Sequence, residues 1–176
     1  MITLAYVDAV ESRLCVKINR FGSYKPVQAF FAMISRAGDW PFWVLIGVAL
    51  FLMNGSAAAR PAIHMVLTVA VGIWLYKALK GKLLRERPYV SNGHIVVGTP
   101  ALDRYSFPSG HTQQAICLTT MLASYAPELL PIIVPFAVLV ALSRVILGLH
   151  YPTDVLAGAA IGFTLAELSL AIGRLV

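Results

Sequence analysis

The sequence predicts an all-α fold: an integral membrane helical bundle of about five transmembrane helices with an N-terminal amphipathic helix. Two observations carry this prediction. Of the 176 residues, 59% are hydrophobic and only 12% are charged, whereas about 25% of the residues of a soluble domain are charged. The apolar residues also gather in long runs, and the mean hydropathy of the chain is +0.77. One buried core could not hold so much apolar surface, so lipid is the expected solvent for much of it.

Five apolar runs have about the length that a membrane-spanning helix needs, roughly 17–25 residues. Helices are expected because a spanning segment in lipid must satisfy its backbone hydrogen bonds internally. The third run opens with polar residues from His111 to Gln114, so we expect its start to line a cavity. Short links before the second and fourth runs predict antiparallel hairpins. The runs are 42–58, 61–79, 111–126, 129–149 and 154–175.

Residues 1–39 differ from the rest of the chain. Apolar residues recur there at helical spacing with polar and charged residues between them, which is typical of an amphipathic helix in the membrane interface. A helix packed against the bundle fits the same pattern equally well. We divide the chain into an amphipathic interfacial segment, 1–39, and a membrane-embedded core, 40–176. The apolar positions in the segment are Val7, Val10, Leu14, Ile18 and Phe21.

Three polar clusters interrupt this apolar background, at residues 80–88, 107–111 and 143–154. Each lies at an end of a predicted helix. The hairpin topology brings all three to one membrane face, because the second and fourth runs end where the third and fifth begin. Each cluster alone has an ordinary explanation, such as helix capping or the anchoring of Lys and Arg at the interface. Their joint occurrence on one face favours a functional site.

The cations of these clusters predict a phosphate site. Lys80, Arg87 and Arg144 would repel one another and lose hydration without an anion between them. A phosphate group relieves this, since guanidinium groups match its oxygens in bidentate fashion. Ser109 and Gly110 open the third run, where the free N–H groups of a helix N-terminus attract an anion. The predicted phosphate-binding residues are Lys80, Arg87, Ser109, Gly110 and Arg144.

Two histidines complete the predicted site. His150 lies four residues before Asp154, whose carboxylate can hold one ring nitrogen protonated and leave the other as a nucleophile. His111 follows the Ser-Gly turn and is placed to donate a proton to the leaving oxygen. In this scheme His150 attacks phosphorus, and water then hydrolyses the phosphohistidine. The predicted catalytic residues are His150, His111 and Asp154.

The three clusters resemble the signature of the type-2 phosphatidic-acid phosphatases, a family that shares a core with the vanadium haloperoxidases. The signature reads K-x6-RP, PSGH and SR-x5-H-x3-D, and it is complete here, starting at Lys80, Pro108 and Ser143. The resemblance covers about residues 40–175. It implies the residue roles given above, a metal-independent reaction and no cofactor. Membrane members often have six spans, so the five predicted here leave the topology and the lipid entry route open.

The expected function is therefore that of a membrane lipid phosphatase acting on a phosphomonoester or a diphosphate. Phosphatidylglycerol phosphate, phosphatidic acid and a polyprenyl phosphate or diphosphate are the candidate substrates. One alternative is a vanadate-dependent haloperoxidase-like enzyme, which the spans disfavour because such relatives resemble large soluble proteins. Another is a catalytically inactive lipid-phosphate-binding membrane protein, which the intact signature disfavours.

The net charge of +6 indicates anionic lipids and an anionic substrate rather than nucleic acid. The expected partners are the lipid bilayer and a lipid phosphate, and a homo-oligomer is compatible with the sequence. We expect a multi-pass protein of a bacterial-type inner (plasma) membrane. All Lys and Arg except Arg60 and Arg174 lie in the N-terminal segment or on the active-site face, which favours a cytoplasmic site. Family members that act on the outer face leave this open.

A few other polar residues carry weaker signals. The two cysteines, Cys15 and Cys117, have no ligand-type spacing and predict no disulfide framework. His64 has no partner pattern and receives no role. Five charged residues flank the predicted site and either contact a lipid head group or are solvated loop charges: Lys77, Lys82, Arg85, Asp103 and Arg104.

Overall fold

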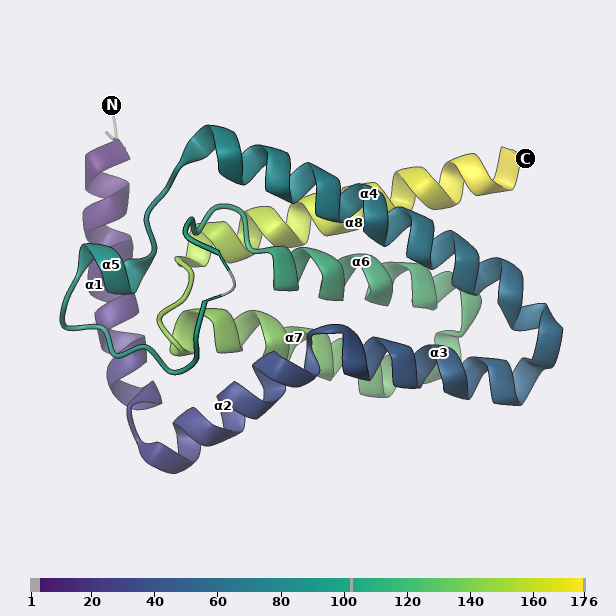
Figure 1. Cartoon of the computed structure of the whole chain (residues 1–176), viewed down its shortest axis with the longest axis horizontal. Coiled ribbons are helices and arrows are strands. Elements are labelled where there is room, and N and C mark those ends of the chain that lie inside the picture. The colour runs from purple at the N-terminus through teal and green to yellow at the C-terminus, as the bar shows by residue number, and fades with distance from the viewer. Residues whose placement is uncertain (1–3, 102, 176) are drawn as a thin grey trace.

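The computed structural model describes residues 4–101 and 103–175, with the backbone alone for residues 4–7. The described residues form helices and short connections, and no strand occurs among them. The all-α prediction is confirmed. The helices are α1 (Leu4–Gly22), α2 (Lys25–Ala37), α3 (Trp40–Asn54), α4 (Ala59–Leu83), α5 (Pro88–Ser91), α6 (Gly110–Tyr125), α7 (Leu130–Ile146) and α8 (Pro152–Leu175), with 3-10 turns at Gly55–Ala58 and Pro127–Leu129 (Figure 1).

Helix α6 is the centre of the bundle. It packs against α8, α7 and α4, and its residues Ala115, Cys117 and Met121 are buried. The long helices lie along roughly the same direction (Figure 1). Helix α1 lies across the end of the bundle where α4 and α7 end and α6 and α8 begin. The three polar sequence clusters therefore lie at the same end of the bundle.

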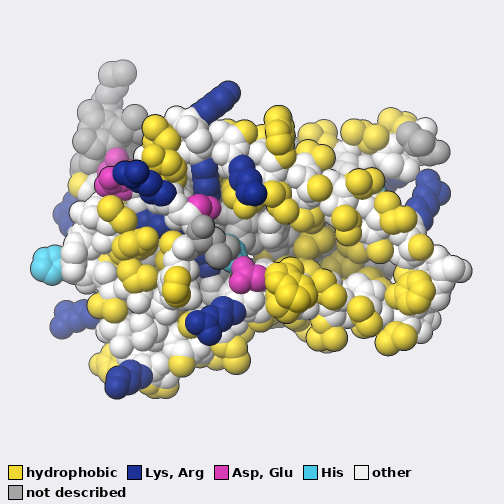
Figure 2. Space-filling model, viewed as in Figure 1, with side chains coloured by type: hydrophobic (Ala, Val, Ile, Leu, Met, Phe, Trp, Pro, Cys, Tyr) yellow, Lys and Arg dark blue, Asp and Glu magenta, His cyan; other side chains and the backbone are white. Residues whose placement is uncertain are grey.

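The outer surface of the bundle is that of a membrane protein. Three stretches of the described residues are long and apolar enough to cross a bilayer: Trp40–Leu83, Pro127–Ile146 and Pro152–Leu175. The first is a hairpin of α3 and α4, which turns at Gly55. Helix α6 has only 16 residues, so the number of five spans stays a prediction. Hydrophobic side chains cover the body of the molecule, while Lys and Arg gather toward the end that carries α1 (Figure 2).

Two glycines set the distance between α6 and α8. A Cβ atom at Gly162 would lie 2.3 Å from the carbonyl oxygen of Gln113, and one at Gly158 would lie 2.5 Å from that of Ser109. The backbone of α8 therefore touches the first turns of α6. This contact lets the Ser109 N–H donate to the carbonyl oxygen of Asp154 at 3.0 Å. The second and third clusters are held together by this packing, because any larger residue would separate the helices.

Helix α1 packs on the bundle by a mixed face, in which Glu11 and Asn19 lie beside Cys15. Glu11, Cys15 and Asn19 are buried, whereas Leu14 and Phe21 are 42% and 58% exposed. Asn19 Nδ2 donates to the carbonyl oxygens of residues 96 and 146 at 2.9 and 3.0 Å. The helix is thus packed against the protein with much of its apolar stripe directed outward, which combines the two sequence interpretations. The side chain of Val7 lies outside the described residues, and the interfacial position of 1–39 stays a prediction.

Candidate active site

One cavity of about 430 Å³ gathers most of the predicted site residues. Six of the eight line it, and they come from the end of α4, the start of α6, the end of α7 and the connections between them. The other two, Ser109 and Asp154, are fully buried and joined to each other through the Ser109 N–H behind the cavity. The six lining residues are Lys80, Arg87, Gly110, His111, Arg144 and His150.

Asp103 holds two of the cations in place. Its carboxylate accepts from Lys80 Nζ at 2.8 and 2.7 Å and from Arg87 Nη2 at 2.7 Å. Burial raises the pKa of Asp103, but the hydrogen bonds and charges of Lys80 and Arg87 outweigh it, so the pKa is lowered and the group is ionised. From the sequence, Asp103 is either a contact for the lipid head group or a solvated loop charge. It lies in the cavity and offsets part of the positive charge there.

The third cation, Arg144, has the fewest hydrogen-bond partners among the described residues. It is only 3% exposed, and its Nη1 donates to Ser35 Oγ of α2. Its Nε has no partner among the described residues. Burying a guanidinium group with a free donor is costly unless an anion completes its hydrogen bonds. Arg144 therefore makes the cavity suited to an anionic ligand.

The contacts of His150 define its tautomer. Its Nε2 lies 3.3 Å from Arg87 Nη1, and because a guanidinium can only donate, Nε2 must carry the lone pair. The proton of the neutral ring is then on Nδ1, which lies 3.7 Å from Asp154 Oδ2, longer than a hydrogen bond. Burial and the charges of Arg144 and Arg87 hold the pKa of His150 well below its usual value. The ring is neutral and presents a lone pair in the cavity.

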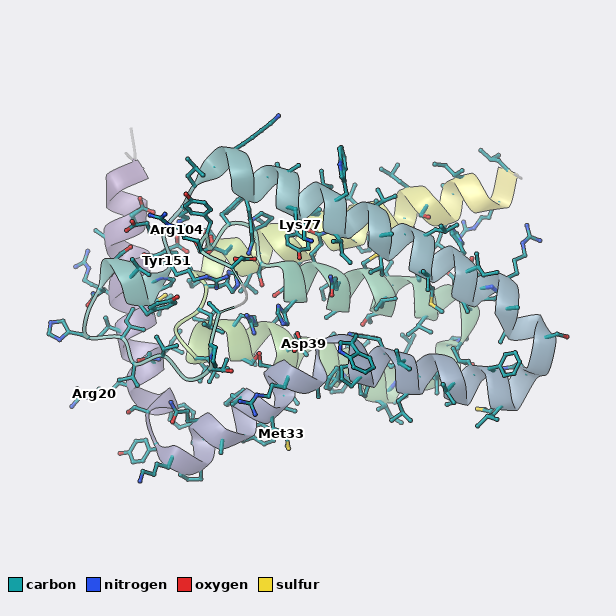
Figure 3. All side chains as sticks on the ribbon, viewed as in Figure 1. Arg20, Met33, Asp39, Lys77, Arg104 and Tyr151 are labelled. Carbon is teal, nitrogen blue, oxygen red and sulfur yellow. The ribbon has the colours of Figure 1, made fainter. Side chains whose placement is uncertain are left out.

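Asp39 is a site residue that sequence reasoning missed. It lies at the junction of α2 and α3 (Figure 3), and its Oδ1 accepts from His111 Nε2 at 2.5 Å. This hydrogen bond lowers the pKa of Asp39. Its position directly before the first span was an available signal, but the separation of 72 residues from His111 hid the pairing. Each of the two site histidines therefore has its own carboxylate, at hydrogen-bond distance only for His111.

Arg85 links helix α1 to the start of α8. Its Nη1 donates to Asp154 Oδ1 at 2.7 Å, and its Nη2 donates to Glu11 Oε2 at 2.7 Å. Glu11 also accepts from the backbone N–H of Thr153 at 2.8 Å. The sequence indicates Arg85 only as a flanking charge, because its partner carboxylates lie far away in sequence. The N-terminal helix thus supports the residue that stands behind His150.

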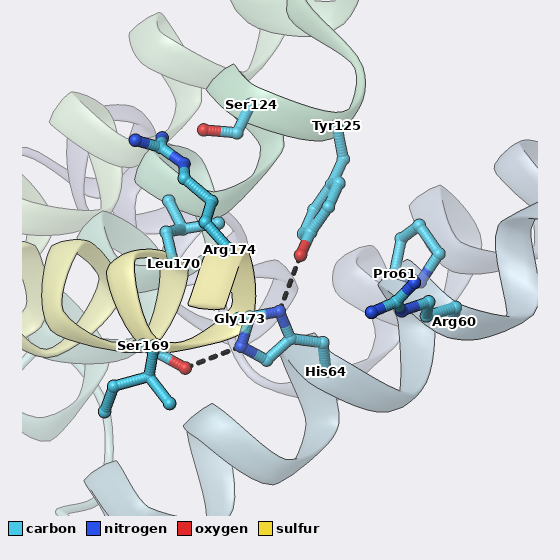
Figure 4. Close-up of a pocket in the computed structure, with 10 residues that line it drawn as sticks. Arg60, Pro61, His64, Ser124, Tyr125, Ser169, Leu170, Gly173 and Arg174 are labelled. Atoms are coloured by element: carbon cyan, nitrogen blue, oxygen red, sulfur yellow. Dashed lines mark hydrogen bonds between the residues drawn. The ribbon is translucent and has the colours of Figure 1, made fainter. Parts of the chain in front are cut away.

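A larger cavity, of about 810 Å³, lies at the opposite end of the bundle. It contains none of the predicted site residues. His64 lies in its wall with both ring nitrogens hydrogen-bonded, to Tyr125 Oη at 2.6 Å and Ser169 Oγ at 2.7 Å (Figure 4). Because none of the predicted site residues lines this cavity and six of the eight line the smaller one, the smaller cavity is the candidate active site.

Comparison with known protein families identifies the family of the chain. The family model of the PAP2 superfamily matches residues 61–174, a range that holds every predicted site residue. The chain belongs to the PAP2 superfamily.

Characterised PAP2 proteins resemble the chain in sequence and structure. It is 38% identical over 125 residues to the decaprenylphosphoryl-5-phosphoribose phosphatase of Mycolicibacterium smegmatis, covering 66% of this chain and 62% of the relative. It is 31% identical over 138 residues to phosphatidylglycerophosphatase B of Bacillus subtilis, covering 71% and 63%. The matches thus span less than two thirds of either relative.

A solved PAP2 structure has the same fold. The crystal structure of a transmembrane PAP2-type phosphatidylglycerolphosphate phosphatase from Bacillus subtilis superposes with a TM-score of 0.78 at 26% identity, covering 99% of this chain and 90% of that one. This similarity includes the N-terminal helices that precede the residues matched by the family model. The membrane bundle is therefore a shared PAP2 architecture.

The α1–α8 link of this PAP2 protein yields a stability prediction. Glu11 and Asp8 both pair with Arg85, at 2.7 and 2.8 Å, but their side chains are 8% and 62% exposed. Glu11→Ala leaves the Thr153 N–H and one side of Arg85 without an acceptor, so it lowers the free energy of unfolding by about 1–3 kcal/mol. Asp8→Ala removes an exposed pair and lowers it by about 0–1 kcal/mol. Thermal unfolding in detergent measures both, and equal losses would contradict the assignment.

Proposed function

We propose that the chain is a membrane lipid phosphate phosphatase that works through a phosphohistidine on His150. The observation that supports this most directly is the position of His150 Nε2, which carries a lone pair and lies against Arg87 in the cavity that Lys80 and Arg144 also line. A nucleophile among cations needs an electrophile that arrives as an anion. A phosphate ester meets both requirements.

The phosphate would bind to Lys80, Arg87 and Arg144. Arg144 has a free Nε to offer, and Gly110 lets the ligand approach the start of α6, where a Cβ would lie 3.3 Å from the Tyr76 ring. The contribution of Ser109 is indirect, since its N–H and hydroxyl are engaged by Asp154 and Thr112. Asp103 must give up part of its hold on Lys80 and Arg87 when a dianion enters.

The first chemical step forms a bond from His150 Nε2 to phosphorus and breaks the bond to the lipid oxygen. As Nε2 becomes bonded, the ring acquires positive charge, and Asp154 stabilises the Nδ1 proton. His111 supplies a proton to the leaving oxygen from the ring nitrogen that Asp39 does not engage. Burial and the charge of Arg144 disfavour a protonated His111 ring, and the Asp39 carboxylate, by accepting its Nε2–H, counteracts them in part.

The second step regenerates the enzyme. His111, now neutral, accepts a proton from a water molecule that attacks the phosphohistidine. The bond between nitrogen and phosphorus breaks, inorganic phosphate leaves, and His150 recovers its lone pair. No step needs a metal or a cofactor.

A lipid substrate is supported by the apolar wall of the cavity. Trp40 of α3 and Ile73 and Tyr76 of α4 also line the cavity, and Trp40 is 74% exposed. The two relatives act, by their names, on a decaprenylphosphoryl phosphoribose and on a phosphatidylglycerophosphate. The candidate substrates remain phosphatidylglycerol phosphate, phosphatidic acid and a polyprenyl phosphate or diphosphate.

The central experiment measures phosphate release by detergent-purified protein from these lipids with EDTA present. We expect release that disappears in His150→Ala, together with a covalent phosphoenzyme in the parent protein only. Release that depends on added metal would contradict the mechanism. Binding of lipid phosphate without release would favour an inactive binding protein, and bromide oxidation by the vanadate-loaded protein would favour the haloperoxidase alternative.

The acid assignment predicts a dependence on the leaving group. His111→Ala should lose about 10²–10⁴-fold of the rate on a lipid alkyl phosphate and much less on an activated aryl phosphate, which needs no protonation. Asp39→Asn should reduce the rate less than His111→Ala does, and again more on the lipid alkyl phosphate than on the aryl phosphate. Asp103→Asn is the matched control, since it removes a carboxylate that touches Lys80 and Arg87 rather than His111. Equal losses on both substrates in Asp39→Asn would exclude Asp39 as the partner of the acid.

The distribution of charge supports an active site on the cytoplasmic face. Only Arg60 and Arg174, among the 14 Lys and Arg, lie toward the opposite end, and cytoplasmic ends of membrane proteins carry an excess of these residues. A membrane-impermeant thiol reagent on intact spheroplasts should then label Ser56→Cys and spare Ser23→Cys. The native cysteines are buried and give little background. The reverse labelling would assign the site to the outer face.

A further inference from the structure

A second, smaller cavity adjoins the candidate active site. It has a volume of about 220 Å³ and shares Asp39, His111 and Arg144 with the candidate active-site cavity. Lys80, Arg87 and His150 do not line it. The two cavities therefore meet at the proposed acid and not at the proposed nucleophile.

This position identifies the part of the substrate that would enter it. In phosphoryl transfer the attacking and leaving atoms lie roughly in line on opposite sides of phosphorus. If His150 attacks, the leaving oxygen is on the His111 side. The atoms that follow the leaving oxygen are then next to the small cavity, which His111 borders.

The lining of the small cavity selects a polar group. Ser35 and Arg36 of α2 and Thr99 of the loop before α6 complete it, and Pro100 is the one apolar residue among the described residues that line it. The candidate active-site cavity, by contrast, has an aromatic and aliphatic wall formed by Trp40, Ile73 and Tyr76. An acyl or prenyl chain fits that wall, and a hydrogen-bonding group fits the small cavity.

The charges make that polar group an anion. Arg36 makes no ion pair within 4.0 Å with any acidic group of the described residues. Asp39, the acidic residue of the cavity, is already engaged by His111. Arg144 lines both cavities, so its positive charge also acts in the small one. The guanidinium of Arg36, the charge of Arg144 and the hydroxyl groups of Ser35 and Thr99 together suit a phosphate.

We propose that the small cavity is a subsite for a second phosphate group of the substrate, held by Arg36, Thr99 and Arg144. The inference rests on the proposed phosphatase function and narrows its substrate class to lipids in which a phosphoryl group lies just beyond the scissile bond. A diphosphate, or a phosphomonoester linked through a short polyol to a phosphodiester, meets this description. Phosphatidic acid does not.

The test compares a prenyl diphosphate with the monophosphate of the same prenyl chain, so that the apolar tail is constant. The parent protein should have the higher kcat/KM for the diphosphate. Arg36→Ala should reduce the ratio of the two kcat/KM values by about tenfold, the order expected for a lost hydrogen bond to a charged group. Thr99→Val should reduce the ratio less, and Arg36→Lys should restore part of it.

The matched control is Arg20→Ala, which removes the same charge from the same end of the molecule. Arg20 points outward from α1 (Figure 3) and lines neither cavity, so both substrates and their ratio should be unchanged. Inhibition by methylenediphosphonate, which cannot be hydrolysed at its bridge, measures binding to the subsite independently of turnover. It should bind the parent protein more tightly than inorganic phosphate does, and Arg36→Ala should remove that difference.

The outcomes separate this inference from the proposed function. An unchanged ratio in Arg36→Ala, with phosphate still released, would overturn the subsite and leave the phosphatase assignment standing. A parent protein that prefers the monophosphate would do the same. Absence of release from every substrate would overturn the proposed function and the subsite with it.

Discussion

The organisation of this protein depends on the placement of three cations at one end of an apolar bundle. Lys80, Arg87 and Arg144 are all buried, and in so apolar a molecule each must find hydrogen-bond acceptors to offset its lost hydration. Asp103 accepts hydrogen bonds from Lys80 and Arg87, whereas among the described residues Arg144 has only the neutral Ser35 hydroxyl as a side-chain partner. The cavity keeps an unsatisfied donor that an anion completes, and the surrounding loops and N-terminal helices are arranged around that need.

The N-terminal helices contribute more to the site than an interfacial anchor would. Ser35 contacts Arg144 and Asp39 contacts His111, so α2 and its junction with α3 reach the cavity directly. Helix α1 acts one step further away, since Glu11 holds Arg85, and Arg85 holds Asp154. Buried Glu11 and Asn19 face the protein beside Cys15, whereas the outer side of α1 carries both apolar and charged residues, among them Leu14, Phe21 and Lys17.

The two histidines differ in how their environments define them. His150 is buried among cations that keep it neutral, which suits a nucleophile. His111 is also buried near Arg144, and both disfavour a charged ring, but its hydrogen bond to the Asp39 carboxylate counteracts them in part. The same His111 separates the apolar-walled cavity from the small polar one, so a single residue borders the phosphate, the leaving group and the proposed second phosphate. Specificity and protonation are therefore expected to be coupled at this residue.

The sequence by itself determined the helical membrane fold and the residues of the three clusters. Runs of apolar residues report lipid exposure directly, and residues at helix ends such as Lys80, His111 and His150 stay near one another whenever the hairpins are antiparallel. Only the tertiary structure decided the pairing of Asp39 with His111, of Asp103 with Lys80 and Arg87, and of Glu11 with Arg85. These partners are separated by 16 to 74 residues, and hydropathy and local spacing carry no information about contacts at such distances. The tertiary structure also showed the close approach of α8 to α6 at Gly158 and Gly162. The sequence alone does not reveal it, because a glycine in a membrane helix can have several roles that depend on which helix packs against it.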